Sequence, residues 1–384
     1  MSRARPLEAA PSERGDESSE TAFLTIDLDA LVANYRRLCE LAAPAECASV
    51  VKADAYGLGM AQVAPPLARA GCKTFFVATL GEAKALRRLL PDVTIYVLAG
   101  LMPETAEAYR KHRLRPVLNS AEEIREWASF SVGKGDRLAC AVHIDSGMNR
   151  LGLSADEVDQ VADARDLWSA FALSLVMSHL ACADEPKHLK NEAQRQAFDR
   201  LRARLPKAFA SLANSAGILL GRAYAYDLVR PGIALYGGNP LAQCENRFRP
   251  VVHLKGRILQ AREAAAGETV GYGATRTLKR ASRIATVSVG YADGFFRSLS
   301  TKDDEEGLVV YVGPHAAPIL GRVSMDLITI DVTDVPERLS RRGEWVELIG
   351  PNVSAQEFAH HAGTIDYEVL TNLGRRAFRR YIGG

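Results

Sequence analysis

The chain has 384 residues, of which 47% are hydrophobic and 24% are charged, a balance that is typical of a folded globular protein. Its 48 Lys and Arg residues and 46 Asp and Glu residues leave a formal charge of +2, which argues against nucleic acid or an anionic membrane as a partner. No uncharged apolar run approaches the roughly 20 residues that a membrane-spanning helix needs. We therefore expect a soluble protein built from one large domain or two.

The cysteines and the N-terminal segment indicate the compartment. Six cysteines are scattered without a CxxC pair, which is typical of single thiols in a reducing environment rather than of disulfides or a metal site. Residues 1–20 carry Pro, Ser and acidic residues but no apolar segment of the kind that a secretion signal contains. We expect residues 1–20 to form a disordered tail, the protein to be cytoplasmic, and the chain to bind no metal.

The next part of the chain predicts alternating strands and helices. TAFLTIDL alternates as a β-strand does, and Asp27 or Asp29 then caps an amphipathic helix. Beyond it, short apolar runs alternate with helical segments, which include residues 81–90, 120–130 and 185–205. The apolar runs cover residues 47–52, 74–78, 94–98, 115–118, 139–145, 172–179, 209–214 and 224–231. Such strands pair in parallel through right-handed crossovers. Eight of them fit a (β/α)8 barrel, although a doubly wound open sheet would give much the same pattern.

After about Gly237 the pattern changes to strands broken by Gly, Pro and Asp turns. Short helices are expected near residues 353–363 and 368–381. The predicted fold class is therefore α/β, with an N-terminal TIM-type (β/α)8 barrel over residues 21–245 and a mostly-β domain over residues 246–384.

Candidate reactive groups follow the predicted barrel strands. Lys52 ends the first run and precedes a loop of small residues. A lysine surrounded by apolar side chains has a lowered pKa and becomes a nucleophile for carbonyl carbons. On its position alone, Lys52 could equally be a surface lysine at a strand end. The segments 214–217 (NSAG) and 230–233 (RPGI) follow the seventh and eighth runs, where barrels bind phosphate. Asn214 could also be only a helix N-cap. A lysine that forms a Schiff base and a phosphate site together suggest pyridoxal phosphate.

Nine motifs occur in an order that resembles alanine racemase. They are SVVKADAYGLG, HIDSGMNRLG, MSHLACAD, LANSAG, VRPGIALYG, VGYGATRT, VSVGYADG, GRVSMDLITIDV and TIDYEVLTNLGRRAFRRY. The resemblance extends from about Thr21 to the C-terminus. It implies a pyridoxal-phosphate enzyme that interconverts L- and D-alanine and supplies D-alanine for peptidoglycan. It also implies a homodimer with shared active sites, and a first strand, around residues 22–28, that joins the β domain.

The resemblance also implies a role for individual residues. Racemisation needs one group on each face of Cα, and these would be Lys52 for the D-isomer and Tyr272 of the other chain for the L-isomer. The cofactor-binding residues would be Lys52, Tyr56, His179, Ser215, Arg230, Gly232, Ile233 and Tyr367. Arg150 and the Met325 backbone would bind the substrate carboxylate, with Asn214, Asp326 and Tyr291 in support and Asp184, Arg297 and Arg322 in the access corridor. Because arginine accepts no proton, Arg230 at the ring nitrogen would leave that nitrogen unprotonated and so suppress transamination.

One position departs from the family in an informative way. His143 stands where many relatives have a lysine, often carbamylated, whose negative charge fixes the neighbouring arginine. We predict that a small anion such as chloride, or another side chain, replaces that charge beside Arg150. Gly271 and Asp366 are smaller departures.

Three other functions are compatible with parts of this sequence. One is a racemase of serine, lysine or several amino acids on the same scaffold. Another is a decarboxylase of the related ornithine and diaminopimelate group, which would be expected to carry an acid in place of Arg230. A third is a non-catalytic barrel that handles pyridoxal phosphate, which would lack the second domain.

Overall fold

The computed structural model describes residues 19–241 and 244–384. The predicted disordered tail therefore lies outside the described residues except for residues 19 and 20. The chain forms two compact units, each made of several segments. One, the barrel unit, contains Thr25–His253, Ile349–Leu373 and Tyr381–Gly384; the other, the antiparallel unit, contains the described residues up to Leu24, Leu254–Leu348 and Gly374–Arg380.

The parallel strands of the barrel unit close into a ring, as the sequence predicted. Within the described residues, seven strands pair in parallel in chain order: β3 (Ser49–Val50), β4 (Thr74–Val77), β5 (Thr94–Val97), β6 (Arg115–Leu118), β7 (Ala139–His143), β8 (Ala172–Met177) and β9 (Phe209–Ser211). The next strand, β10 (Leu228–Val229), pairs with β2 (Glu46–Cys47), which precedes β3. Beside β10, Asp227 N donates to Ala210 O and Arg230 N donates to Ala213 O. These bonds join the last strand to both β9 and β2, so the sheet is a closed (β/α)8 barrel and not an open doubly wound sheet.

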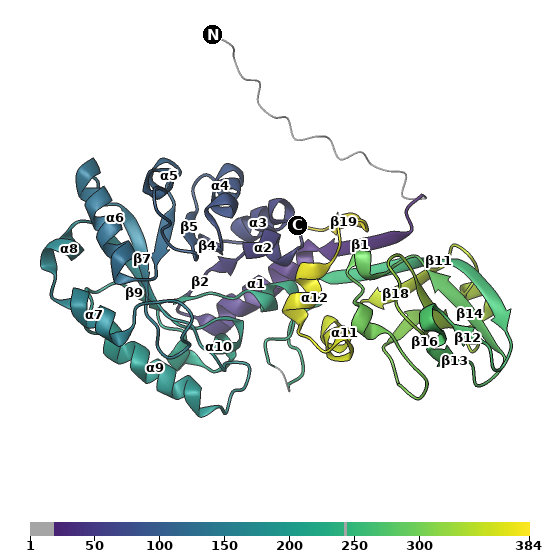
Figure 1. The fold of residues 1–384 in the computed structure, drawn as a ribbon. Helices are drawn as coiled ribbons and strands as arrows, with labels where there is room; N and C mark the ends of the chain where they lie inside the picture. The colour runs from purple at the N-terminus through teal and green to yellow at the C-terminus, as the bar shows by residue number, and fades with distance from the viewer. Residues whose placement is uncertain (1–18, 242–243) are drawn as a thin grey trace, which may run out of the picture. The chain divides into compact units, whose positions relative to one another are not determined.

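Helices cover the outside of these strands (Figure 1). They are α3 (Met60–Arg69), α4 (Leu80–Leu89), α5 (Ala106–Lys111), α6 (Ala121–Lys134), α7 (Ala155–Ala162), α8 (Arg165–Ser169), α9 (Leu189–Arg202) and α10 (Ser215–Leu219). The N-cap of α4 is a capping box of Thr79 and Glu82, in which each side chain bonds to the other residue's backbone N–H. Of the two caps proposed for α1 (Leu28–Ala42), Asp27 is the one used, since its Oδ1 accepts from Ala30 N at 2.8 Å.

Three predicted elements differ from those in the structure. The run 224–231 is a strand only over Leu228–Val229, because Tyr226 has a φ of 50° and breaks the extended backbone. The long helix begins at Leu189 and not at residue 185, since Glu185 precedes a proline, a position that disfavours helical backbone. The predicted C-terminal helix 368–381 is wrong in its second half: α12 (Asp366–Asn372) ends before Gly374, and β19 (Phe378–Ile382) is a strand.

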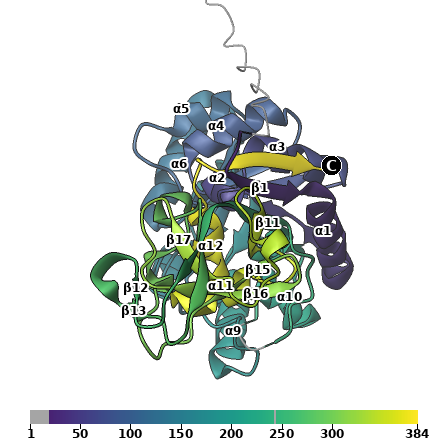
Figure 2. The same ribbon diagram turned by 90° about the vertical axis from the view of Figure 1, so that its right-hand side faces the viewer.

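The antiparallel unit is built around an eight-stranded sheet with the strand order β14-β17-β16-β15-β18-β11-β1-β19. Its strands are β1 (Ala22–Asp27), β11 (Val252–Ala264), β14 (Ser282–Val287), β15 (Val309–Val312), β16 (His315–Leu320), β17 (Ile328–Asp331), β18 (Trp345–Ile349) and β19. Buried and less buried positions alternate along β15, as expected for a sheet with one face in the core. The first predicted strand, β1, lies between β11 and β19. A ribbon of β12 (Thr269–Val270) and β13 (Arg276–Thr277) projects from this unit (Figure 2).

The turn after β3 has an unusual backbone. In α2 (Lys52–Tyr56), the residues Ala53, Asp54, Ala55 and Tyr56 all have φ between 52° and 56°, so that this turn is left-handed. Each such residue costs about 1–2 kcal/mol relative to a right-handed turn. Backbone bonds from Ala55 N to Val51 O (3.0 Å) and from Gly57 N to Ala53 O (2.7 Å) hold the turn closed. The Asp54 carboxylate accepts from Met60 N at 2.8 Å and ties the turn to the start of α3.

The handedness of this turn predicts an unusual response to substitution. Ala53 has φ 52° and an exposed side chain, so a substitution there acts mainly through the backbone. We expect Ala53→Val to lower the free energy of unfolding by about 1 kcal/mol, because a β-branched residue fits poorly at positive φ. Ala53→Gly, the matched control, should keep or raise it, and denaturant unfolding of both variants is the measurement. Equal stability of the two variants would contradict the left-handed turn.

Candidate active site

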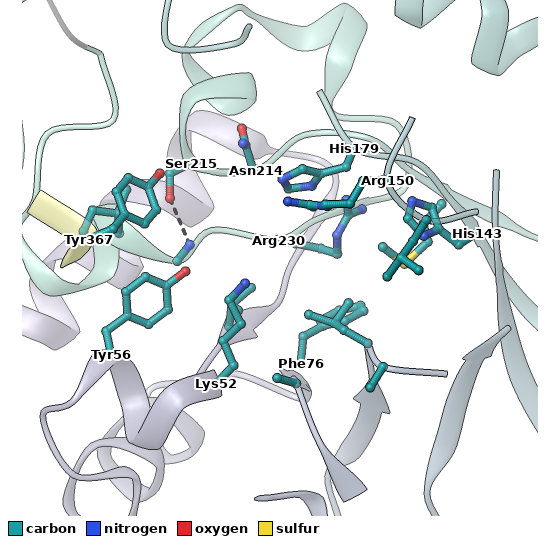
Figure 3. A pocket seen from close by; sticks show the side chains of 18 of the residues that line it. Lys52, Tyr56, Phe76, His143, Arg150, His179, Asn214, Ser215, Arg230 and Tyr367 are labelled. Atoms are coloured by element: carbon teal, nitrogen blue, oxygen red, sulfur yellow. Dashed lines mark hydrogen bonds between the residues drawn. The ribbon is translucent and has the colours of Figure 1, made fainter. Parts of the chain in front are cut away.

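A cavity of about 510 Å³ opens at the carboxyl ends of the barrel strands, where loops of barrel enzymes usually carry the chemistry. The residues that line it are Val50, Lys52, Tyr56, Phe76, Ala78, Thr79, Leu98, Ala99, His143, Arg150, Leu151, Met177, His179, Asn214, Ser215, Arg230, Gly232, Ile233 and Tyr367. Figure 3 shows that the labelled side chains converge from several strand ends. All the site residues that the sequence placed in the barrel are therefore brought together, with His143 among them.

Lys52 and Tyr56 project into this cavity from the two ends of the left-handed turn (Figure 3). Burial lowers the pKa of Lys52, and the positive charge of Arg150 lowers it further, while the Glu82 carboxylate opposes both effects. A lower pKa leaves more of the amine unprotonated at neutral pH, which is the form that attacks a carbonyl carbon. Lys52 therefore has the surroundings of a lysine that forms a Schiff base.

The loops after β9 and β10 form a small pocket of hydrogen-bond donors. Ser215 Oγ accepts from Gly232 N at 2.9 Å and from Ala234 N at 3.3 Å, so its hydroxyl proton remains to be donated to another oxygen. Gly232 is required at its position because a Cβ there would overlap the Tyr56 hydroxyl. Asn214 is the N-cap of α10, and its side chain accepts from Gly217 N at 2.8 Å. This confirms the helix N-cap that the sequence offered as an alternative for the segment NSAG.

Two tyrosines add hydroxyl donors to the same pocket. The Tyr56 ring lies 4.6 Å from that of Tyr236 and 6.0 Å from that of Tyr367, measured between ring centroids. Burial raises the pKa of Tyr56, and burial together with the negative charges of Asp184 and Asp366 raises the pKa of Tyr367 to about 12. Both phenols therefore stay protonated at neutral pH and can donate to an anion such as a phosphate.

Arg230 is almost fully buried, with 4% of its surface exposed. Its guanidinium donates to Ser211 Oγ and, at 2.6 Å, to Ser178 O, and it lies 5.9 Å from the centre of the Phe76 ring. Burial lowers the pKa of Arg230, but a guanidinium remains charged at neutral pH. No carboxylate among the described residues pairs with this charge. The side chain thus presents donors and a positive charge to the cavity and offers no acceptor.

The two histidines of the cavity are neutral at neutral pH. Burial, with the charges of Arg230 and Arg150, lowers the pKa of His143 to about 4, and its Nδ1 lies 2.9 Å from Asn119 Oδ1. Burial and the same two arginines lower the pKa of His179 well below its ordinary value. His143 therefore does not repel Arg150, but it supplies no negative charge either. Because Arg150 contacts no carboxylate in the part of the chain that the structure describes, a small anion beside it stays a prediction.

Of the remaining predicted residues, Asp184 belongs to the barrel unit and the others belong to the antiparallel unit. Tyr272 begins the turn η3 (Tyr272–Ala274) and is 73% exposed, and Tyr291 and Met325 are exposed as well. The Asp326 carboxylate pairs with Arg376 at 2.5 Å. Each of these side chains is thus accessible in a single copy of the chain.

Several residues of the site gave no recognisable signal in the sequence. Phe76 packs against Arg230, Tyr236 against Tyr56, and Asn119 bonds to His143. Phe76 lies on β4, Asn119 directly follows β6, and Tyr236 ends the 3-10 helix η2 (Ile233–Tyr236); each is far from its partner in the chain, so only the closed barrel brings the pair together. Arg376 is adjacent to Arg375 in GRRAF, and nothing local distinguishes the two.

No group of three or more His, Cys, Asp or Glu side chains in residues 19–241 and 244–384 is placed to hold a metal ion. No helix in this part of the chain has the length and apolarity that a bilayer crossing needs.

The cavity fits pyridoxal phosphate by the chemistry of its donors. The Lys52 amine, with its lowered pKa, suits the aldehyde of this cofactor. The protonated hydroxyls beside Gly232 suit its phosphate, and the uncompensated guanidinium of Arg230 suits a ring nitrogen that accepts a hydrogen bond. The absence of a side chain at Gly232 lets the Tyr56 hydroxyl approach this loop closely, so that it lies beside the Ser215 hydroxyl in the same donor cluster.

Comparisons with known proteins agree with this fit. Residues 26–240 match the alanine racemase N-terminal domain, and residues 251–381 match the alanine racemase C-terminal domain. The alanine racemase of Methylobacterium nodulans is 52% identical over 96% of this chain and 98% of its own, and that of Rhodospirillum rubrum is 49% identical over 96% and 98%.

Solved structures give the same result. The alanine racemase of Bartonella henselae, with covalently bound pyridoxal phosphate, has a TM-score of 0.89 and 41% identity, and the match covers 94% of this chain and 99% of that one. The biosynthetic alanine racemase of Pseudomonas aeruginosa has a TM-score of 0.86 and 36% identity, with 95% and 100% covered. The chain belongs to the alanine racemase family, whose members depend on pyridoxal phosphate and interconvert L- and D-alanine.

Proposed function

We propose that this alanine racemase transfers protons through Lys52 on one face of the substrate and through the partner subunit's Tyr272 on the other. The protein would work in the cytoplasm as a homodimer whose two sites each use both chains, and its D-alanine would supply peptidoglycan. The observation that supports this assignment best is the convergence of Lys52, Arg230 and the hydroxyls around Gly232 on one cavity.

The cofactor-binding residues follow from the donors described above. When bound, pyridoxal phosphate supplies an electron sink that acidifies the α-proton of the amino acid. Ser215, Gly232, Ile233, Tyr56 and Tyr367 would hold its phosphate. Arg230 would donate to the ring nitrogen, and His179 would connect Arg230 with the proton-transferring phenol.

Racemisation requires one proton-transferring group on each face of Cα. A single base tends to return the proton to the face from which it came, so inversion needs a second group opposite the first. The lowered pKa of Lys52 suits a base for the D-isomer. A phenol acts as a base only when nearby cations stabilise its anion, and Arg150 and Arg230 would provide that stabilisation for Tyr272. Met325, through its backbone N–H, and Arg150 would hold the substrate carboxylate.

Two alternatives are less well supported. A decarboxylase of the related group would be expected to place a carboxylate at the ring nitrogen, whereas the buried group here is Arg230. A non-catalytic barrel would lack the second domain, whereas residues 251–381 match the C-terminal domain of the family. A racemase of another amino acid differs from the proposal only in side-chain specificity, which we assign to Tyr291 and Tyr367 as groups that narrow the entrance.

Isotope exchange tests the reaction. Incubation of the holoenzyme with L-alanine in deuterated water should give D-alanine and deuterium at Cα, because inversion replaces the α-proton by one from a solvent-exchanged group. L-serine and L-lysine, run in parallel, should react at least tenfold more slowly if the entrance admits only a methyl group, an effect of about 1.4 kcal/mol. Equal rates for serine or lysine would favour the broad-specificity alternative, and pyruvate in place of D-alanine would contradict racemisation.

Complementation between two inactive variants tests the shared site. Lys52→Ala and Tyr272→Phe should each lose almost all activity as homodimers. In a co-expressed mixed dimer, one site combines intact Lys52 with the partner's intact Tyr272, so random pairing should restore about one quarter of the activity per subunit. Tyr311→Phe, a tyrosine on β15, is the control and should keep wild-type activity. No recovery in the mixture would contradict sites built from two chains.

The position of His143 predicts an effect of chloride. If a small anion beside Arg150 replaces the charge that relatives carry on a modified lysine, the KM for alanine should fall several-fold when chloride replaces gluconate at constant ionic strength, because Arg150 is then held in place. His143→Gln keeps a neutral hydrogen-bonding group at this position and should retain the effect. A KM that is independent of chloride would contradict the prediction.

A further inference from the structure

We propose that Arg376 is a positioning residue for the reaction: it locks the loop of Tyr291 to the turn of Met325 and so sets the KM for alanine and the discrimination against longer side chains. The inference rests on the proposed function, which assigns Tyr291 and Met325 to the substrate site. All the residues that carry it belong to the antiparallel unit.

The Arg376 guanidinium contacts two carboxylates on different segments. Its Nε and one terminal nitrogen donate to the two oxygens of Asp293 at 2.8 Å and 2.7 Å, and the other terminal nitrogen donates to Asp326 at 2.5 Å. Asp293 ends the turn η4 (Tyr291–Asp293), and Asp326 directly follows Met325. One rigid planar group thus spans both segments with three charge-assisted bonds.

Asp293 is the buried end of this arrangement. Its side chain is 4% exposed, against 50% for Arg376 and 55% for Asp326. The Asp293 carboxylate also accepts from Gly290 N at 2.9 Å, and its backbone carbonyl accepts from Gly374 N at 2.8 Å. A buried carboxylate without its cation is strongly destabilised, so Arg376 fixes the conformation of the loop and does not merely touch it.

The loop of Tyr291 and the turn of Met325 are also joined directly. Tyr291 N donates to Ser324 O and Ala292 N donates to Met325 O, both at 3.0 Å. A Cβ on Gly290 would overlap the carbonyl oxygens of Ser324 and Met325, which shows how closely the two backbones approach. A movement of one segment therefore moves the other.

The turn that Arg376 holds presents a free donor. Within the described residues, the Met325 backbone N–H has no acceptor, while its neighbour Leu327 N donates to Ser324 Oγ at 3.2 Å. In the proposed function this N–H binds the substrate carboxylate, and Tyr291 narrows the entrance. Displacement of such groups by about 1 Å is enough to weaken substrate positioning many-fold.

Four variants of the holoenzyme test the role of Arg376. Arg376→Ala should raise the KM for alanine about tenfold with a smaller change in kcat, and should raise the kcat/KM of L-2-aminobutyrate relative to alanine several-fold, since both segments lose their common support. Arg376→Lys keeps the positive charge but loses the planar guanidinium that bonds to two carboxylates at once, so its KM and its specificity should lie between those of the wild type and those of Arg376→Ala. Asp326→Asn should give a smaller change in the same direction. Arg375→Ala is the matched control, because Arg375 is the exposed neighbour and forms no ion pair with any other described residue.

A merely structural role would lower stability and leave the split between KM and kcat and the specificity ratio unchanged. Kinetics of Arg376→Ala that equal those of Arg375→Ala would overturn the inference. If Arg376→Ala does not fold, Arg376→Lys and Asp326→Asn still decide, because unaltered KM and specificity in both would also overturn it. Lys52→Ala and Tyr272→Phe, measured in the same series, separate the two proposals. If either of these two variants retains activity, the proposed function is contradicted. If both are inactive while Arg376→Ala has wild-type kinetics, only the inference about Arg376 is contradicted.

Discussion

The ends of the last three barrel strands meet at one buried cation, and the cofactor side of the site depends on it. Arg230 follows β10 and donates to the Ser211 hydroxyl at the end of β9 and to the Ser178 carbonyl after β8. Ser211 in turn donates to Leu228 O on β10 at 2.5 Å. Among the described residues the guanidinium bonds only to neutral oxygens, so it keeps an uncompensated charge while it ties the strands together. Such a group costs desolvation energy, and it is retained where an acceptor from a ligand completes it.

This charge also affects the protonation of its neighbours. Burial is the main cause that lowers the pKa values of both cavity histidines and of Lys52; Arg230 and Arg150 lower those of the histidines further, and Arg150 lowers that of Lys52 further. The result is a cavity with two permanent cations, neutral imidazoles and an amine of lowered pKa. An environment of this kind favours anionic ligands, as a phosphate and an amino-acid carboxylate are. It also favours the neutral, nucleophilic form of the Lys52 amine, because a third positive charge in the cavity would be repelled.

The two units of the chain hold their candidate site residues in different ways. The barrel unit supplies a preformed pocket whose groups are held by backbone bonds, such as those from Gly232 and Ala234 to Ser215. In the antiparallel unit the candidate groups are exposed and lie on turns, among them Tyr272 and Met325, and the ion pairs of Arg376 with Asp293 and Asp326 hold the turn beside Met325.

The succession of strands and helices and the mostly-β second part could be predicted from the amino-acid sequence, as could Lys52 and the ordered motifs of the family. Those properties are local, since hydrophobic periodicity, caps and motifs are read within a few residues. Four other features became clear from the fold: β10 closes a barrel, Phe378–Ile382 is a strand, residues 53–56 turn left-handed, and Arg376 rather than Arg375 holds Asp293. These outcomes depend on partners distant in the chain: β9 and β2 for β10, β1 for β19, and Asp293 for Arg376. A pattern within one segment contains no information about which distant groups will satisfy its hydrogen bonds and charges, so the folded chain alone could settle them.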